Sequence, residues 1–97
     1  MEGKERKIQE LQILEQNIQN LLLQKQAFQM ELSETKAAKA EVAKAGDEVF
    51  KIIGQLMIKS DKNKVQSDLE NKERLLELRL KSIEKQETEL RSSLERL

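Results

Sequence analysis

Apolar residues recur at alternating steps of three and four along the first half of the chain, the spacing of a helix that packs against another helix. Residues 4–45 contain no Gly and no Pro, the residues that disfavour a helix most strongly. We therefore predict a helix over residues 1–45, with Gly46 as the C′ residue that ends it. The predicted seam consists of Leu11, Leu14, Ile18, Leu21, Phe28, Leu32 and Val42, with polar residues at Lys25, Thr35 and Lys39.

A stricter repeat runs through the last third of the chain and predicts a second helix over residues 61–97. Every seventh residue from Leu69 to Leu97 is Leu or Ile, and Ser60 or Asp61 precedes the repeat as a capping residue. Glu73 and Glu87 interrupt the seam, so we expect it to be weaker than a uniform zipper. Its apolar positions are Leu69, Leu76, Leu80, Ile83, Leu90, Leu94 and Leu97.

The segment 46–60 follows neither repeat. It is rich in β-branched and apolar residues, and Gly54 separates two apolar runs, which predicts two strands over 48–53 and 55–59 that turn near Gly54. At about 1.5 Å per residue, each helix would reach roughly 50–60 Å. The expected fold is mainly α, a single domain (1–97) in which a long antiparallel two-helix coiled coil is joined by one β-hairpin.

The predicted hairpin is apolar on both faces, and this points to oligomerisation. A lone two-stranded hairpin is marginal in water, and its edges expose unpaired N–H and C=O groups. We expect hairpins from several subunits to pair into a shared β-barrel. The alternative is that the segment folds over the base of its own coiled coil. The assembly residues are Val49, Phe50, Ile52, Ile53, Leu56, Met57 and Ile58.

Charge and composition narrow the function. The chain has 18 basic and 18 acidic residues, without a polycationic segment, which disfavours nucleic-acid binding. It contains no Cys and no His, so we expect no disulfide, no metal site and no imidazole base. A phosphate-binding loop and a catalytic motif are also missing, so we expect neither an enzyme nor a cofactor. Without a long apolar run, a soluble cytoplasmic protein with no membrane contact is expected.

The hairpin sequence EVFKIIGQLMIK, residues 48–59, resembles the single hairpin of β-class prefoldin subunits, particularly those of the archaeal type. The flanking segments 22–26, 31–34 and 80–87 are also similar to that family, and the resemblance covers nearly the whole chain. It implies an ATP-independent chaperone, a hetero-hexamer of two α-type and four β-type subunits with a barrel body and projecting coiled coils. Such an assembly holds unfolded client proteins at the coiled-coil tips and transfers them to a group II chaperonin.

Capture of unfolded chains requires exposed apolar side chains near the free helix ends. Ile13 and Ile8 are off the main seam and Leu97 is terminal, so these three are favoured over ordinary seam residues. An acidic contact with the chaperonin is expected from Glu87, Glu89 and Glu95. A structural or adaptor coiled coil with one specific helical partner remains the alternative function. The client-binding candidates are Ile8, Leu11, Ile13, Leu14, Leu90, Leu94 and Leu97.

Overall fold

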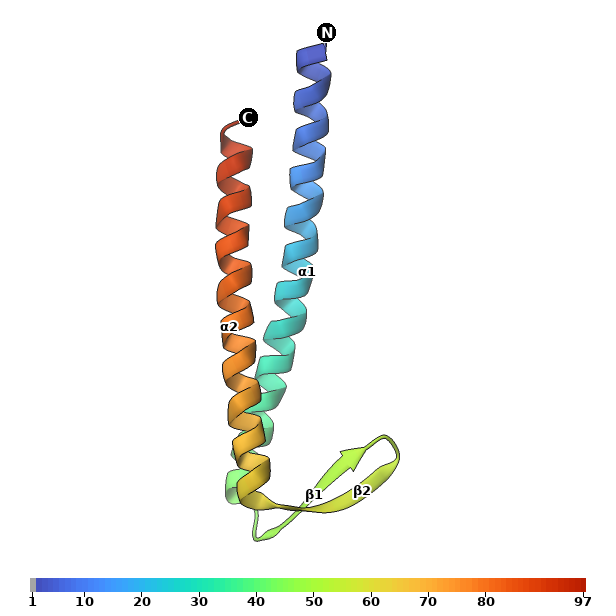
Figure 1. Ribbon diagram of the computed structural model, residues 1–97, viewed down its shortest axis with the longest axis vertical. Coiled ribbons are helices and arrows are strands. Elements are labelled where there is room, and N and C mark those ends of the chain that lie inside the picture. Colours follow the sequence, from blue (N-terminus) through green and yellow to red (C-terminus); the bar gives the residue numbers. More distant parts are fainter. Residues whose placement is uncertain (1) are drawn as a thin grey trace. The chain divides into compact units, whose positions relative to one another are not determined.

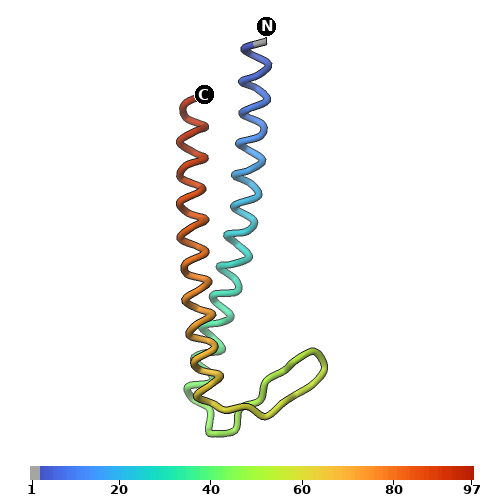
Figure 2. The backbone as a smooth tube through the Cα atoms, in the orientation of Figure 1, coloured from blue at the N-terminus to red at the C-terminus, as the bar shows by residue number. Residues whose placement is uncertain are grey.

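The computed structural model describes residues 2–97 and confirms a mainly α fold with one hairpin. Helix α1 spans Glu2–Lys44, strand β1 Glu48–Ile53, strand β2 Leu56–Asp61 and helix α2 Lys62–Glu95 (Figures 1 and 2). The chain divides into two compact units. The first unit holds the chain up to Gln29 together with Leu78–Leu97, and the second holds Met30–Glu77.

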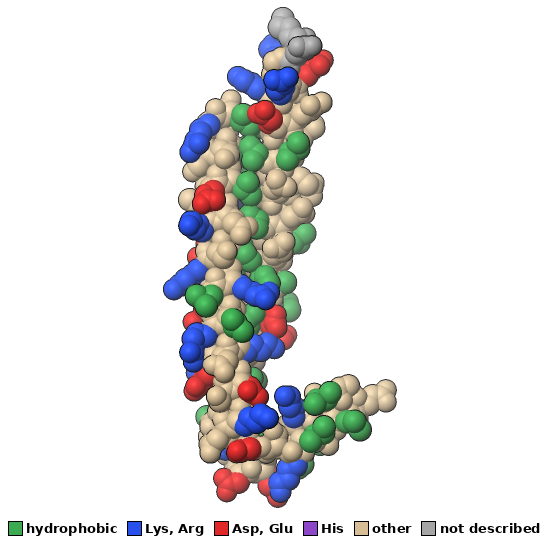
Figure 3. Space-filling model, viewed as in Figure 1, with side chains coloured by type: hydrophobic (Ala, Val, Ile, Leu, Met, Phe, Trp, Pro, Cys, Tyr) green, Lys and Arg blue, Asp and Glu red, His purple; other side chains and the backbone are tan. Residues whose placement is uncertain are grey.

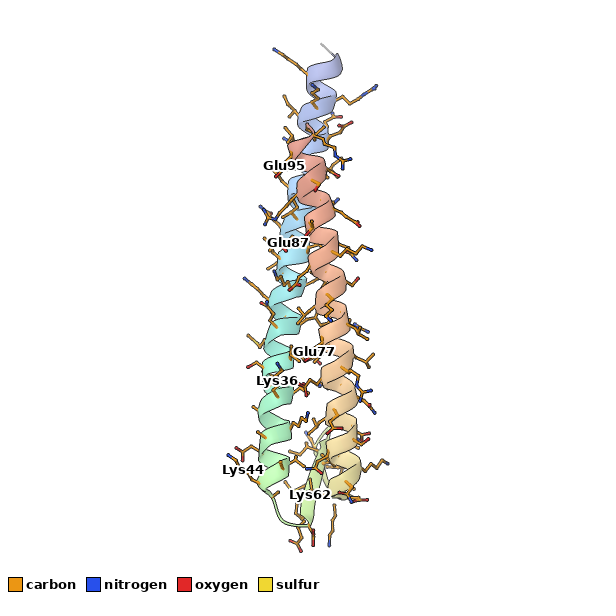
Figure 4. The ribbon with its side chains drawn as sticks, turned by 90° about the vertical axis from the view of Figure 1, so that its left-hand side faces the viewer. Lys36, Lys44, Lys62, Glu77, Glu87 and Glu95 are labelled. Carbon is orange, nitrogen blue, oxygen red and sulfur yellow. The ribbon has the colours of Figure 1, made fainter. Side chains whose placement is uncertain are left out.

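In the first unit the N-terminal part of α1 lies beside the C-terminal part of α2, and the two helices run antiparallel. The beginning of α1 continues past the end of α2 (Figures 1 and 4). The core follows the predicted seam, because residues at heptad spacing share one helix face. Its buried side chains are Ile18, Leu21, Leu80 and Ile83.

The second unit contains the remaining parts of both helices and the hairpin, with Leu76, Val49 and Thr35 buried. Thr35 is only 3% exposed although it is polar. Its Oγ1 donates a hydrogen bond to the backbone carbonyl of Glu31, at 2.7 Å. A hydroxyl bonded to its own helix carries no unmet polar group into the seam, which explains how Thr35 is tolerated there.

Helix α1 ends at Lys44, and the backbone N–H of Ala45 still bonds to the carbonyls of Glu41 and Val42, so Gly46 takes the predicted C′ position without a positive φ. Among the described residues, positive φ occurs at Gly54 alone. The end of α1 also accepts a hydrogen bond from Lys62, the first residue of α2, whose Nζ donates to the carbonyl oxygen of Ala45 at 2.7 Å. This lysine satisfies one of the carbonyls that the end of a helix leaves without a partner in the helix itself.

The hairpin has a two-residue turn at Gly54 and Gln55, with Ile53 opposite Leu56. Gly54 has φ 61°, and no described residue other than glycine has positive φ, which is the pattern of a type II′ turn. The second strand therefore begins at Leu56 rather than at the predicted residue 55. It continues to Asp61, whose Oδ1 accepts a hydrogen bond from the backbone N–H of Asn63 at 3.1 Å and caps α2.

The charged seam positions pair with one another. Lys25 contacts Glu87 in the first unit at 3.4 Å, and Lys39 contacts Glu73 in the second unit at 3.1 Å. The predicted charged interruptions of one helix are thus the partners of those in the other, whereas Thr35 bonds to its own helix. The seam contains charged layers rather than isolated unpaired charges.

Candidate functional site

The hairpin carries the densest exposed apolar surface of the second unit. Six of its side chains are between 45% and 69% exposed, and Figure 3 shows apolar side chains gathered on it. We call this set the hairpin surface. It consists of Phe50, Ile52, Ile53, Leu56, Met57 and Ile58.

The strand register places this apolar surface on both faces of the hairpin. Ile52 pairs with Met57 on one face, and Ile53 pairs with Leu56 on the other. Burying one such side chain is worth about 1.5–3 kcal/mol, so leaving all of them in water is costly. The edges of the two-stranded sheet are also unpaired in this chain. Such a surface is suited to pairing with further strands.

Val49 differs from the other predicted assembly residues because its side chain is buried within its own chain, at 8% exposure. Beside it, Phe50 and Lys51 line an apolar groove of about 300 Å³ with Val65 and Leu69 of α2. The first residues of β1 therefore lie against α2, whereas the rest of the hairpin is exposed. For Val49 the intrachain packing that we kept as an alternative is what the structure shows.

The predicted tip residues separate into two groups in the first unit. Ile8 is 54% exposed, Ile13 61% and Leu97 39%. Seam geometry explains the difference, since off-seam and terminal side chains are not covered by a partner helix. The half-buried group consists of the seam residues Leu11, Leu14, Leu90 and Leu94.

The acidic residues expected to contact the chaperonin also differ in exposure. Glu87, labelled in Figure 4, has a side chain that is only 16% exposed, and it contacts Lys25 and Arg91 at 3.4 and 3.3 Å. Its carboxylate is engaged inside the coiled coil and is poorly placed for an outside partner. Glu89 and Glu95 remain exposed near the end of α2.

Sequence reasoning missed four exposed apolar residues on the helices. They are 59% to 66% exposed and lie outside the heptad seam. The sequence did contain the signal, since any large apolar residue off the seam of a two-helix coiled coil faces solvent. They are Leu23, Met30, Leu75 and Leu78.

The chemistry offered by residues 2–97 is that of apolar surface and paired charge. Within this described part of the chain, no group of three acidic, His or Cys side chains is arranged to hold a metal ion. None of its helices is long and apolar enough to cross a membrane. No buried side-chain N or O atom in that range lacks a hydrogen-bond partner. The arrangement is suited to binding other polypeptides.

Comparison with known proteins gives a consistent result. The family model described as prefoldin subunit matches residues 5–97. The chain is 39% identical to prefoldin subunit beta of Sulfurisphaera tokodaii over 89 residues, covering 90% of this chain and 71% of that protein. It is 38% identical to prefoldin subunit beta of Thermococcus onnurineus over 90 residues, covering 91% and 78%.

Solved structures agree with these sequence relatives. The crystal structure of the prefoldin beta subunit from Thermococcus strain KS-1 is similar with a TM-score of 0.86 and 34% identity, covering 95% of this chain and 82% of that one. The beta2 subunit from the same strain has a TM-score of 0.78 at 16% identity, covering 100% of both chains, and supports the fold alone.

Proposed function

Because the chain belongs to the prefoldin subunit family, we propose that it is a β-type subunit of an ATP-independent chaperone that holds unfolded proteins. Membership of the family implies assembly with other prefoldin subunits. The proposed complex is a hetero-hexamer of two α-type and four β-type subunits in the cytoplasm. It would transfer its clients to a group II chaperonin.

The observation that carries the proposal is the exposure of Ile8 and Ile13 on α1, joined by Leu97 at the chain end. Unfolded proteins share exposed apolar side chains rather than a common sequence. A helix surface with separate exposed isoleucines, free of a rigid pocket, can contact many such chains weakly. Several copies in one complex would strengthen the binding by raising the effective concentration of sites.

Assembly is assigned to the hairpin surface. Its apolar side chains on both faces and its unpaired strand edges are the features that a shared β-barrel would bury. The exposed carboxylates of Glu89 and Glu95 are the remaining candidates for contact with the chaperonin.

An aggregation assay tests client capture. The complex with an α-type subunit is mixed with two unrelated denatured proteins, and light scattering is followed. We expect the Ile8→Ser, Ile13→Ser, Leu97→Ser triple variant to lose protection of both clients while native mass spectrometry shows an intact complex. The matched control replaces Leu23, Met30 and Leu75 by Ser, three apolar residues elsewhere on the helices that are 59% to 66% exposed.

Equal protection by the tip variant and wild type would refute the tip assignment. If the control variant loses protection equally, exposed apolar residues outside the tips bind clients as well as the tip residues do. A wild-type complex that protects neither client would favour the adaptor function, in which the coiled coil recognises one specific helical partner.

A further inference from the structure

Two ion pairs lie within the helical seam rather than on the outer surface. In the first unit, Lys25 Nζ is 3.4 Å from Glu87 Oε2, and these side chains are 25% and 16% exposed. In the second unit, Lys39 Nζ is 3.1 Å from Glu73 Oε2, with exposures of 41% and 19%. We call these two contacts the seam pairs. A third interhelical pair in the described part of the chain, Lys72 with Glu31, is more exposed on both sides, at 52% and 44%.

The seam pairs specify the same antiparallel register. Lys39 follows Lys25 by two heptads, and Glu73 precedes Glu87 by the same number of residues. Each unit therefore contains its own charged layer, and both layers match in one alignment of the helices. That alignment also brings Leu21 beside Leu90 in the first unit, where both line one groove.

The heptad repeat by itself does not distinguish this register from one shifted by seven residues. Because the seam repeats every seven residues, a shift of seven still places Leu21 opposite an apolar residue, Ile83. The same shift places Lys25 opposite Leu80 and Glu87 opposite Ile18. A charge held against an apolar side chain without a partner is strongly unfavourable.

The second unit gives the same result. The shift that separates Lys25 from Glu87 places Glu73 opposite Leu32 and Lys39 opposite Gln66. A shift in the opposite direction places Lys25 opposite Leu94 and Glu73 opposite Gly46. In either direction both seam pairs are lost together, so their effects on register reinforce one another.

We propose that the seam pairs select the register of the coiled coil and thereby set how far α1 extends past the end of α2. Charged pairs in a seam add little net stability, but a polar seam position is known to specify register in coiled coils. In the shifted register, Leu97 would lie opposite Ile8 and the overhang of α1 would be seven residues shorter. The seam pairs thus keep the beginning of α1 uncovered.

Disulfide trapping in the full 97-residue chain tests this proposal. The chain has no Cys, so introduced pairs report cleanly. Leu21→Cys with Leu90→Cys reports the observed register, and Leu21→Cys with Ile83→Cys reports the shifted one. Both reporters are equilibrated in glutathione buffer, and the intrachain disulfide is quantified by mass spectrometry. No client is present, so the result is independent of the proposed chaperone function.

With the natural charges we expect the observed-register disulfide to dominate. Replacing Lys25, Glu87, Lys39 and Glu73 together by Leu should raise the shifted disulfide relative to the observed one by about tenfold or more, although the chain unfolds at a higher temperature. An unchanged ratio in this all-Leu chain, which retains a complete apolar seam, would overturn the proposal.

A charge reversal supplies the second test. Glu87→Lys opposes Lys25 and should shift the ratio toward the shifted register, and adding Lys25→Glu should restore it. Restoration separates register selection from simple loss of stability. The matched control is Lys72→Glu, which makes the same size of charge change at the exposed pair and should leave the ratio unchanged. A control that shifts the ratio as much as Glu87→Lys would refute the role of the seam.

Discussion

The cross-strand pair Ile52 and Met57 provides a sharp test of how the hairpin is used. Their side chains are 69% and 68% exposed, and they lie opposite each other on one face of the hairpin. Replacing both by Ser removes almost no burial from the isolated chain. Its free energy of unfolding should therefore change by no more than about 0.5 kcal/mol per site, as is typical of surface substitutions.

The effect on assembly should be much larger. If both side chains become buried between subunits, each substitution removes about 1.5–3 kcal/mol of favourable burial per subunit, or about 3–6 kcal/mol for the pair. At 1.4 kcal/mol per factor of ten, the affinity between subunits should fall by roughly 10²- to 10⁴-fold. The measurement is native mass spectrometry and sedimentation with an α-type subunit across a concentration series.

The control is Leu23→Ser with Met30→Ser on α1, where two residues of the same exposure are replaced outside the hairpin. It should leave the mass of the complex unchanged. If the hairpin instead packs within its own chain, the opposite result is expected. The Ile52→Ser, Met57→Ser chain would then unfold at a lower denaturant concentration and assemble normally. That outcome would refute the reasoning from exposure to assembly.

Two further predictions concern stability. Gly54→Ala should destabilise the chain by about 1–2 kcal/mol in urea unfolding, because φ 61° is unfavourable for a residue with a Cβ, even though nothing lies within 4 Å of the added atom. Gly46→Ala, at a glycine without positive φ, should be neutral or slightly stabilising, and an equal loss at both sites would contradict the backbone argument. Thr35→Val should raise the free energy of unfolding by about 1 kcal/mol, because a methyl group replaces a buried hydroxyl in the seam. Thr88→Val is its control, since Thr88 makes the same bond to the carbonyl of Glu84 on an exposed face, and a gain there of equal size would show that burial is irrelevant.

Local patterns in the sequence were sufficient to predict the elements of this fold. The heptad spacing identified both helices, and the apolar run around Gly54 identified the hairpin, because these signals depend on residues within a few positions of one another. The exposure of Ile8 and Ile13 also followed from their position off the seam.

Contacts between distant residues were decided by the tertiary structure. Lys25 and Glu87 were expected only as interruptions, and their pairing depends on the alignment of two helices that are far apart in sequence. The hydrogen bond from Lys62 to the carbonyl of Ala45 was not expected for the same reason, as it forms only because the hairpin returns α2 to the end of α1. Val49 is buried because β1 begins against its own chain. A repeating sequence specifies which face a residue occupies, but which residue it meets depends on how the distant segments are aligned.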